Sequence, residues 1–165
     1  MSFDNNLFLA NSHNSSKKIL LVVESPSKVN KIQKYVGNKF IVLASFGHIR
    51  DLDHKTLSID VENNFQPTYV VSKGKNKVIR ELKSKAKKCG EVWLACDYDR
   101  EGESIAWHIS QVLKLKKDKT KRVVFTEITK KALKKAIQKP GELDMNMFYS
   151  QQARRILDRL IGYLI

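Results

Sequence analysis

The sequence is poor in the residues that build disulfide-linked, fibrous or membrane-spanning chains. Its two cysteines, Cys89 and Cys96, form no CxxC pair and have no histidine at ligand spacing, which excludes a disulfide framework and a zinc site. We expect both thiols to be reduced and buried. Only 7 glycines and 3 prolines occur among 165 residues, which argues against a fibrous or disordered chain. No apolar run is long enough to span a membrane.

The beginning of the chain also lacks the basic segment and apolar stretch of a secretion signal. We therefore expect residues 1–17 to form a disordered polar tail. We expect the protein to be intracellular, in the cytoplasm and nucleoid or in the nucleus.

Acidic side chains are scarce relative to basic ones. The chain has 17 Asp and Glu against 31 Lys and Arg, a net charge of +14. Such a charge predicts a polyanionic partner, and nucleic acid is the leading candidate. The length fits one domain, or one domain with part of another, and excludes three packed domains.

Apolar segments typical of strands alternate with segments typical of helices. The expected strands are residues 18–23, 40–45, 92–96 and 122–125, and the expected helices are residues 25–35, 78–88, 105–113 and 129–137. This alternation predicts an α/β fold with a mainly parallel four-stranded sheet and helices on both faces. The polar stretch from Asp51 to Gln66 is expected to be an extended loop.

Pro140 and Gly141 predict a boundary between a domain over residues 18–139 and the start of a following one over residues 140–165. Apolar residues recur at helical spacing from Phe148 to Tyr163, and the pattern reaches Ile165 without a stop signal. We therefore expect a truncated domain here, with exposed apolar side chains that favour self-association.

Carboxylates follow two of the predicted strands. Glu24 follows the first strand, and Asp97, Asp99 and Glu101 follow the third. Molecules that bind to open α/β sheets do so at the carboxyl ends of the strands. Coordination by oxygen atoms alone favours a hard ion such as Mg²⁺. Alternation on an extended backbone would turn the last three carboxylates toward one side. In the simpler alternative, these acids merely complement the dipole of a helix.

Several basic side chains fit a phosphate ligand. Lys28 lies in the first helical turn after Glu24, where its ammonium group and the backbone N–H groups of that turn could face the same phosphate. A solvated lysine without a ligand explains its position equally well. His48 follows the second strand and could lie at the same edge of the sheet. The alternative is that it is a structural histidine with no ligand. The eight Lys and Arg residues between positions 73 and 88 are typical of a solvated helix face, which supports general phosphate attraction and no specific contact.

The last helix places Arg154 and Asp158 at i,i+4, an ordinary stabilising pair. This pairing leaves Arg155 as the freer candidate for a phosphate contact.

Taken together, these motifs resemble the Toprim domain of type IA DNA topoisomerases. The motifs are VESPSK at 23–28, GHIRDL at 47–52, DYDREGE at 97–103, FTEIT at 125–129 and QQARRILDRLIGY at 151–163. The resemblance covers residues 18–165. Its last motif, which Toprim primases and nucleases lack, opens the domain that follows Toprim in these topoisomerases.

The resemblance implies a Toprim fold in an enzyme that cuts one DNA strand, passes another and reseals the first. Glu24 matches the glutamate that acts as general acid toward the leaving 3′-hydroxyl and as general base on religation. This role needs a carboxyl whose pKa is raised by its acidic neighbours. Lys28 matches a lysine that steadies the phosphate charge. The residues matching the Mg²⁺ ligands are Glu24, Asp97, Asp99 and Glu101. The residues matching the single-stranded DNA path are His48, Arg154, Arg155, Asp158 and Tyr163.

Two features depart from the family pattern. Cys96 and Tyr98 stand where a small hydroxyl residue and a proline are common, which affects packing rather than ligand chemistry. The nucleophilic tyrosine of the family lies far downstream in another domain, and none of the 5 tyrosines here lies in a similar stretch. We therefore expect this chain to fold and bind Mg²⁺ and DNA, and to need the downstream domains for relaxation of supercoils.

Two other functions stay open at the level of sequence. A separate Toprim nuclease would nick DNA with metal-activated water, and Asp97→Ala and Asp99→Ala would abolish the nicking. A non-catalytic nucleic-acid-binding module would lose affinity steeply with salt, regardless of Mg²⁺ or of Glu24→Gln.

Overall fold

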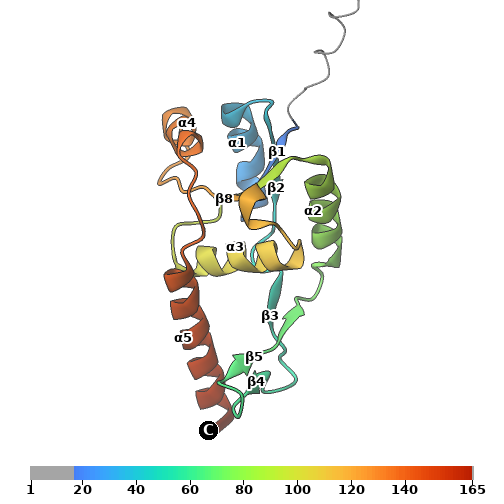
Figure 1. The fold of residues 1–165 in the computed structure, drawn as a ribbon, viewed down its shortest axis with the longest axis vertical. Coiled ribbons are helices and arrows are strands. Elements are labelled where there is room, and N and C mark those ends of the chain that lie inside the picture. The colour runs from blue at the N-terminus through green and yellow to red at the C-terminus, as the bar shows by residue number, and fades with distance from the viewer. Residues whose placement is uncertain (1–16, 165) are drawn as a thin grey trace, which may run out of the picture.

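The computed structural model describes residues 17–164, so the tail expected over residues 1–17 lies almost wholly outside the described residues. A four-stranded parallel sheet forms its centre (Figure 1), in the order β2–β1–β7–β8. The strands are β1 (Ile19–Val23), β2 (Phe40–Ala44), β7 (Glu91–Leu94) and β8 (Thr120–Arg122). The predicted parallel sheet is confirmed.

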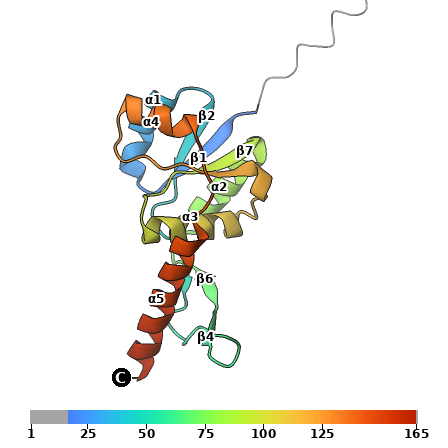
Figure 2. The same ribbon diagram turned by 60° about the vertical axis from the view of Figure 1, so that its left-hand side comes forward.

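Helices cover both faces of this sheet (Figures 1 and 2). On one face, α2 (Asn76–Lys88) and α3 (Arg100–Val112) pack around Leu20 and Val22. On the other, α1 (Val29–Val36) and α4 (Lys130–Gln138) pack around Leu21 and Val23. Successive side chains of a strand point to opposite faces, so the fully buried strand β1 contributes to both cores.

Most expected elements occur, with shifted ends. The strands β7 and β8 end earlier than predicted. The sequence placed their ends too late because the buried apolar runs continue into the loops, where Ala95, Cys96 and Val123 are 4%, 3% and 1% exposed. The helix expected over residues 25–35 starts as the 3-10 turn η1 (Pro26–Lys28). Its Ser25 does not cap the helix, because the Ser25 hydroxyl bonds the Ser27 hydroxyl at 2.8 Å. Both cysteines are free and buried, as predicted.

The segment after β2 is more ordered than the predicted loop. In it, β3 (Arg50–Leu52) pairs antiparallel with β6 (Tyr69–Val71), and β4 (Ile59–Asp60) pairs with β5 (Gln66–Pro67). Strands of two or three residues are too short for alternation to mark them in a sequence. These pairs form an arm that extends from the sheet beside α5 (Figure 1).

The last helix, α5 (Met145–Leu164), packs against α3 through the stacked rings of Trp107 and Phe148, whose centroids are 4.1 Å apart. Its other side carries Leu157 and Ile161, which are 56% and 47% exposed, as the sequence predicts. Self-association and the domain boundary near Pro140 stay predictions. No helix within residues 17–164 is both long and apolar enough to cross a membrane.

Candidate metal and nucleic-acid site

The carboxyl ends of β1 and β7 bring Glu24 and Asp97 together. The parallel register pairs Val22 with Leu94, and the backbone N–H of Asp97 donates to Glu24 Oε1 at 2.8 Å. Partial burial raises the pKa of the Glu24 carboxyl above its ordinary value, and the charges of Asp97 and Asp99 raise it further. The hydrogen bond from Asp97 opposes this shift without cancelling it. The three carboxylates therefore lie close enough to interact.

The prediction that one extended segment orients all the acids is wrong beyond Asp99, because α3 begins at Arg100. Asp99 is the N-cap of this helix, and its Oδ1 accepts from the N–H of Gly102 at 2.6 Å. Glu101 lies in the first helical turn, where it contacts His48 and accepts from Gln151 Nε2 at 2.7 Å. Asp99 and Glu101 thus lie at the N-terminus of α3, where the simpler alternative, acids that complement a helix dipole, also places them.

Within residues 17–164, no three His, Cys, Asp or Glu side chains are placed as a ready metal centre. The donors at this edge are nevertheless carboxylate oxygens, which suit Mg²⁺. Asp99 and Glu101 already accept hydrogen bonds from the protein. Binding by all four predicted ligands would therefore have these side chains share their oxygens with hydrogen bonds or give those bonds up.

Lys28, the last residue of η1, is exposed and forms no ion pair within the described part of the chain. Its predicted contact with phosphate is therefore not blocked by a competing acid.

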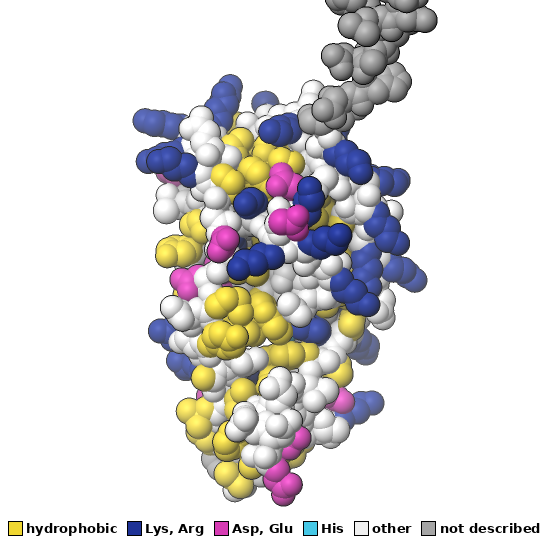
Figure 3. All heavy atoms as spheres, viewed as in Figure 1, with side chains coloured by type: hydrophobic (Ala, Val, Ile, Leu, Met, Phe, Trp, Pro, Cys, Tyr) yellow, Lys and Arg dark blue, Asp and Glu magenta, His cyan; other side chains and the backbone are white. Residues whose placement is uncertain are grey.

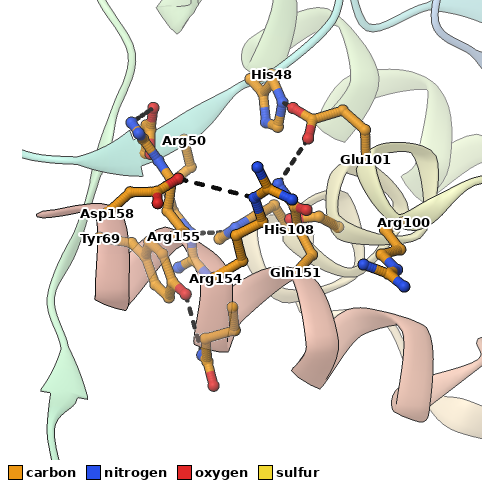
Figure 4. Close-up of a pocket in the computed structure, with 13 residues that line it drawn as sticks. His48, Arg50, Tyr69, Arg100, Glu101, His108, Gln151, Arg154, Arg155 and Asp158 are labelled. Atoms are coloured by element: carbon orange, nitrogen blue, oxygen red, sulfur yellow. Dashed lines mark hydrogen bonds and ion pairs between the residues drawn. The ribbon is translucent and has the colours of Figure 1, made fainter.

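A pocket of about 530 Å³ lies beside the acidic edge, between α3, α5 and the arm (Figure 4). Four of the five predicted DNA contacts line it, namely His48, Arg154, Arg155 and Asp158. The fifth, Tyr163, lies outside the lining near the end of α5 and is 53% exposed. Arg50 and Arg100 add two further cations to the lining.

Of the two neighbouring arginines of α5, one behaves as expected and the other does not. Arg155 donates to both carboxylate oxygens of Asp51, at 3.2 and 2.7 Å, so it is not the freer cation. Arg154 is 72% exposed and lies 3.9 Å from Asp158, the predicted i,i+4 pair. The reason is long-range: pairing of β3 with β6 presents Asp51 to α5. Of these two arginines, Arg154 is therefore the more available for phosphate.

The charge of Arg155 also changes the titration of its partner. Partial burial raises the pKa of Asp51, but the hydrogen bonds from Arg155 and from the N–H of Leu52 outweigh it and hold the pKa below its ordinary value. The bond to Asp51 raises the pKa of Arg155 in turn. The ion pair is thus intact at neutral pH.

An aromatic cluster that sequence reasoning missed supports the floor of the pocket. Arg50 Nε donates to Nδ1 of His108 at 2.9 Å, and its guanidinium lies over the rings of Tyr69 and Trp107 at 5.2 and 5.4 Å. Burial and the charge of Arg50 lower the pKa of His108 to about 3. The imidazole is therefore neutral and accepts the hydrogen bond. Nothing in the apolar pattern of α3 distinguishes His108 from a core residue.

We expect the contribution of His108 to lower the stability of the fold as the pH falls below about 6.5. The folded-state pKa of His108, about 3, lies below its ordinary value of 6.5, so the unfolded chain binds the extra proton between these values. This one group costs up to about 1.4 kcal/mol per pH unit in that window. Thermal unfolding between pH 7.5 and 5 should show a weaker pH dependence for His108→Gln than for the original chain. Equal dependence in the two proteins would contradict the assignment.

A buried ion pair that the sequence did not indicate fixes the loop carrying the acids. Arg122 and Glu103 are 3% and 1% exposed and bond at 2.6 Å. The same guanidinium donates to the carbonyls of Leu94, Cys96 and Asp97 at 3.1, 2.6 and 2.7 Å. It thus holds the backbone from the end of β7 to the first acid of the site.

Gly102 lets the N-terminus of α3 approach this loop. A Cβ atom at Gly102 would lie 1.9 Å from the carbonyl oxygen of Asp97, a separation that no side chain tolerates. The glycine of the DYDREGE motif is therefore required by close packing of helix on loop.

A parallel sheet with acids after two adjacent strands, and helices on both faces, defines the class of this domain. The family model of the Toprim domain matches residues 19–128, and the chain belongs to that family. Among solved structures it is similar to full-length topoisomerase I from Thermotoga maritima, with 47% sequence identity and a TM-score of 0.80. The match covers 87% of this chain and 24% of that one, so the chain spans about a quarter of that protein. This likeness confirms the resemblance to type IA enzymes.

Proposed function

We propose that this chain supplies the acid-base and Mg²⁺-binding part of a type IA DNA topoisomerase, which breaks and rejoins one DNA strand. The contact between Glu24 and Asp97 at the ends of β1 and β7 carries the proposal. A carboxyl whose pKa is raised above its ordinary value is better suited to donating a proton and to taking it back.

In this function Glu24 protonates the leaving 3′-oxygen on cleavage and recovers the proton from the 3′-hydroxyl on religation. Lys28, exposed one turn away along the chain, offsets negative charge that develops on the phosphate. The acid and the cation thus stabilise negative charge at two places on the same phosphodiester, the leaving oxygen and the phosphate group.

The residues that would hold Mg²⁺ are Glu24, Asp97, Asp99 and Glu101. When bound, the ion supplies positive charge that keeps the phosphate and the 3′-end in register. Rotation of Glu101 toward the ion would release His48 and Gln151, which then become available to DNA.

The pocket beside the acids is proposed to guide single-stranded DNA. Arg154 contacts phosphate directly, whereas Arg155 positions Asp51 and the arm. His48 and Asp158 lie at the same pocket, and Tyr163 extends the path along α5. The remaining partners are the further domains of the enzyme, which carry the nucleophilic tyrosine, and the chain by itself should not relax supercoiled plasmid.

Titration calorimetry with Mg²⁺ tests this proposal. We expect Asp97→Asn to weaken Mg²⁺ binding by about tenfold or more, because direct ligands matter at least as much as the groups that orient them. Glu24→Gln should weaken it as well. Glu62→Gln, which neutralises an exposed acid in the β4–β5 turn, is the matched control and should leave binding unchanged. Equal affinities in all four proteins, or relaxation of plasmid by the purified chain, would refute the proposal.

A further inference from the structure

A second cationic pocket lies at the opposite edge of the sheet, where the strands begin. Its volume is about 670 Å³, and Glu91, the first residue of β7, lies in its wall. Its lysines come from α2, from the segment that follows α3 and from the 3-10 turn η2 (Lys117–Lys119). They are Lys83, Lys87, Lys114, Lys116 and Lys119. Figure 3 shows Lys and Arg side chains gathered along one edge of the molecule, over α2. We call these five residues the far-edge lysines.

The far-edge lysines carry more charge than the fold neutralises. All five are exposed, and none makes an ion pair or side-chain hydrogen bond within residues 17–164. The ends of α2 and α3 contribute about half a negative charge each, and Glu91 contributes one more. About two negative charges thus face five positive ones, so the pocket attracts anions.

Lys114 provides an independent observation. Its φ of 52° lies in the left-handed region, just after the C-cap Leu113, and its N–H donates to the Gln111 carbonyl at 3.1 Å. Glycine usually occupies this position at the end of a helix, because a side chain there strains the backbone. A lysine in a strained conformation in the lining of a cationic pocket points to a use for its side chain.

We propose that the far-edge lysines bind the phosphate backbone of double-stranded DNA; the choice of DNA as the polyanion rests on the proposed function. The described lining contains neither an aromatic ring to stack on unpaired bases nor an Arg, Asn or Gln to read base edges. The pocket at the acidic edge differs, since it contains Tyr69, histidines and arginines. The acidic edge therefore suits a single strand, and the far edge suits the backbone of a duplex.

Fluorescence anisotropy with a short labelled duplex, and with a single strand of equal length, tests the proposal over a series of KCl concentrations. Each lost phosphate contact reduces the slope of log affinity against log salt by about 0.9 for duplex. The triple variant Lys114→Gln/Lys116→Gln/Lys119→Gln should therefore lower the duplex slope by about 2 to 3 and change single-strand binding little. The matched control, Lys130→Gln/Lys131→Gln/Lys134→Gln on α4, should change neither. Equal losses in both triple variants, or no loss in either, would overturn the proposal.

Lys114→Gly separates binding from stability. Relief of the left-handed strain should raise Tm by a few degrees, while the lost charge should lower the duplex slope by about one. A rise in Tm with unchanged duplex binding would show that Lys114 is only a strained helix end. None of these variants alters Glu24 or Asp97. Titration with Mg²⁺ therefore tests the proposed function, and duplex binding tests the role of the far-edge lysines separately.

Discussion

Replacing Arg122 with methionine is expected to destabilise the fold by about 3–5 kcal/mol, the cost of leaving one partner of a buried ion pair uncompensated. Methionine fills much of the volume of arginine, so the loss is chiefly electrostatic. Glu103 would remain buried without its cation, and the carbonyls of Cys96 and Asp97 would lose their donor. The loop that carries the acids would loosen along with the fold.

Urea unfolding measures this loss directly, and two further proteins interpret it. Arg154→Met removes an arginine that is 72% exposed, and its effect should stay below about 0.5 kcal/mol. Adding Glu103→Leu to Arg122→Met should restore part of the stability, because the unpaired buried charge is then gone. An Arg122→Met protein that loses less than about 1 kcal/mol would show that water or a neighbouring group replaces the guanidinium.

A single methyl group at Gly102 is expected to destabilise the protein by about 3 kcal/mol or more. The new Cβ would meet the Asp97 carbonyl at 1.9 Å, and a backbone atom has no rotamer through which to yield. Separation of α3 from the loop would also break the cap that Asp99 makes with the N–H of Gly102. Gly102→Ala should therefore weaken Mg²⁺ binding as well as lower Tm.

Gly162→Ala is the matched control for this substitution. Gly162 lies within α5, and a Cβ there has no atom within 4 Å, so alanine should stabilise the helix by about 0.5–1 kcal/mol. Opposite changes in Tm for the two variants are the expected result. A Gly102→Ala protein as stable as the original chain would mean that the loop adjusts without cost.

The sheet and the position of its acids were predictable because both depend on local patterns. Continuous apolar runs indicate strands buried on both faces, as in β1, and strand ends then locate Glu24 and Asp97. The orientation of Glu101 was not predictable, because it depends on His48 and Gln151, distant in sequence. The family resemblance supplied roles that the pattern alone left open.

Contacts between charged residues far apart in sequence account for most of the remaining errors. The expectation for Arg155 failed because Asp51, 104 positions away, lies opposite it. The pair of Arg122 and Glu103 was missed because charged residues are rarely buried, and a sequence carries no mark of such an exception. Short strands such as β4 and β5 depend in the same way on their surroundings.

Helix α5 makes hydrogen bonds to the rest of the molecule along one side, and these bonds connect two separate parts of the structure. Gln151 holds Glu101 at the acidic edge, Arg155 holds Asp51, and Arg159 donates to backbone carbonyls of the arm at 2.6 and 2.8 Å. These residues recur every four positions on one stiff helix. One side of α5 therefore joins the arm to the acidic edge through contacts that do not involve the sheet.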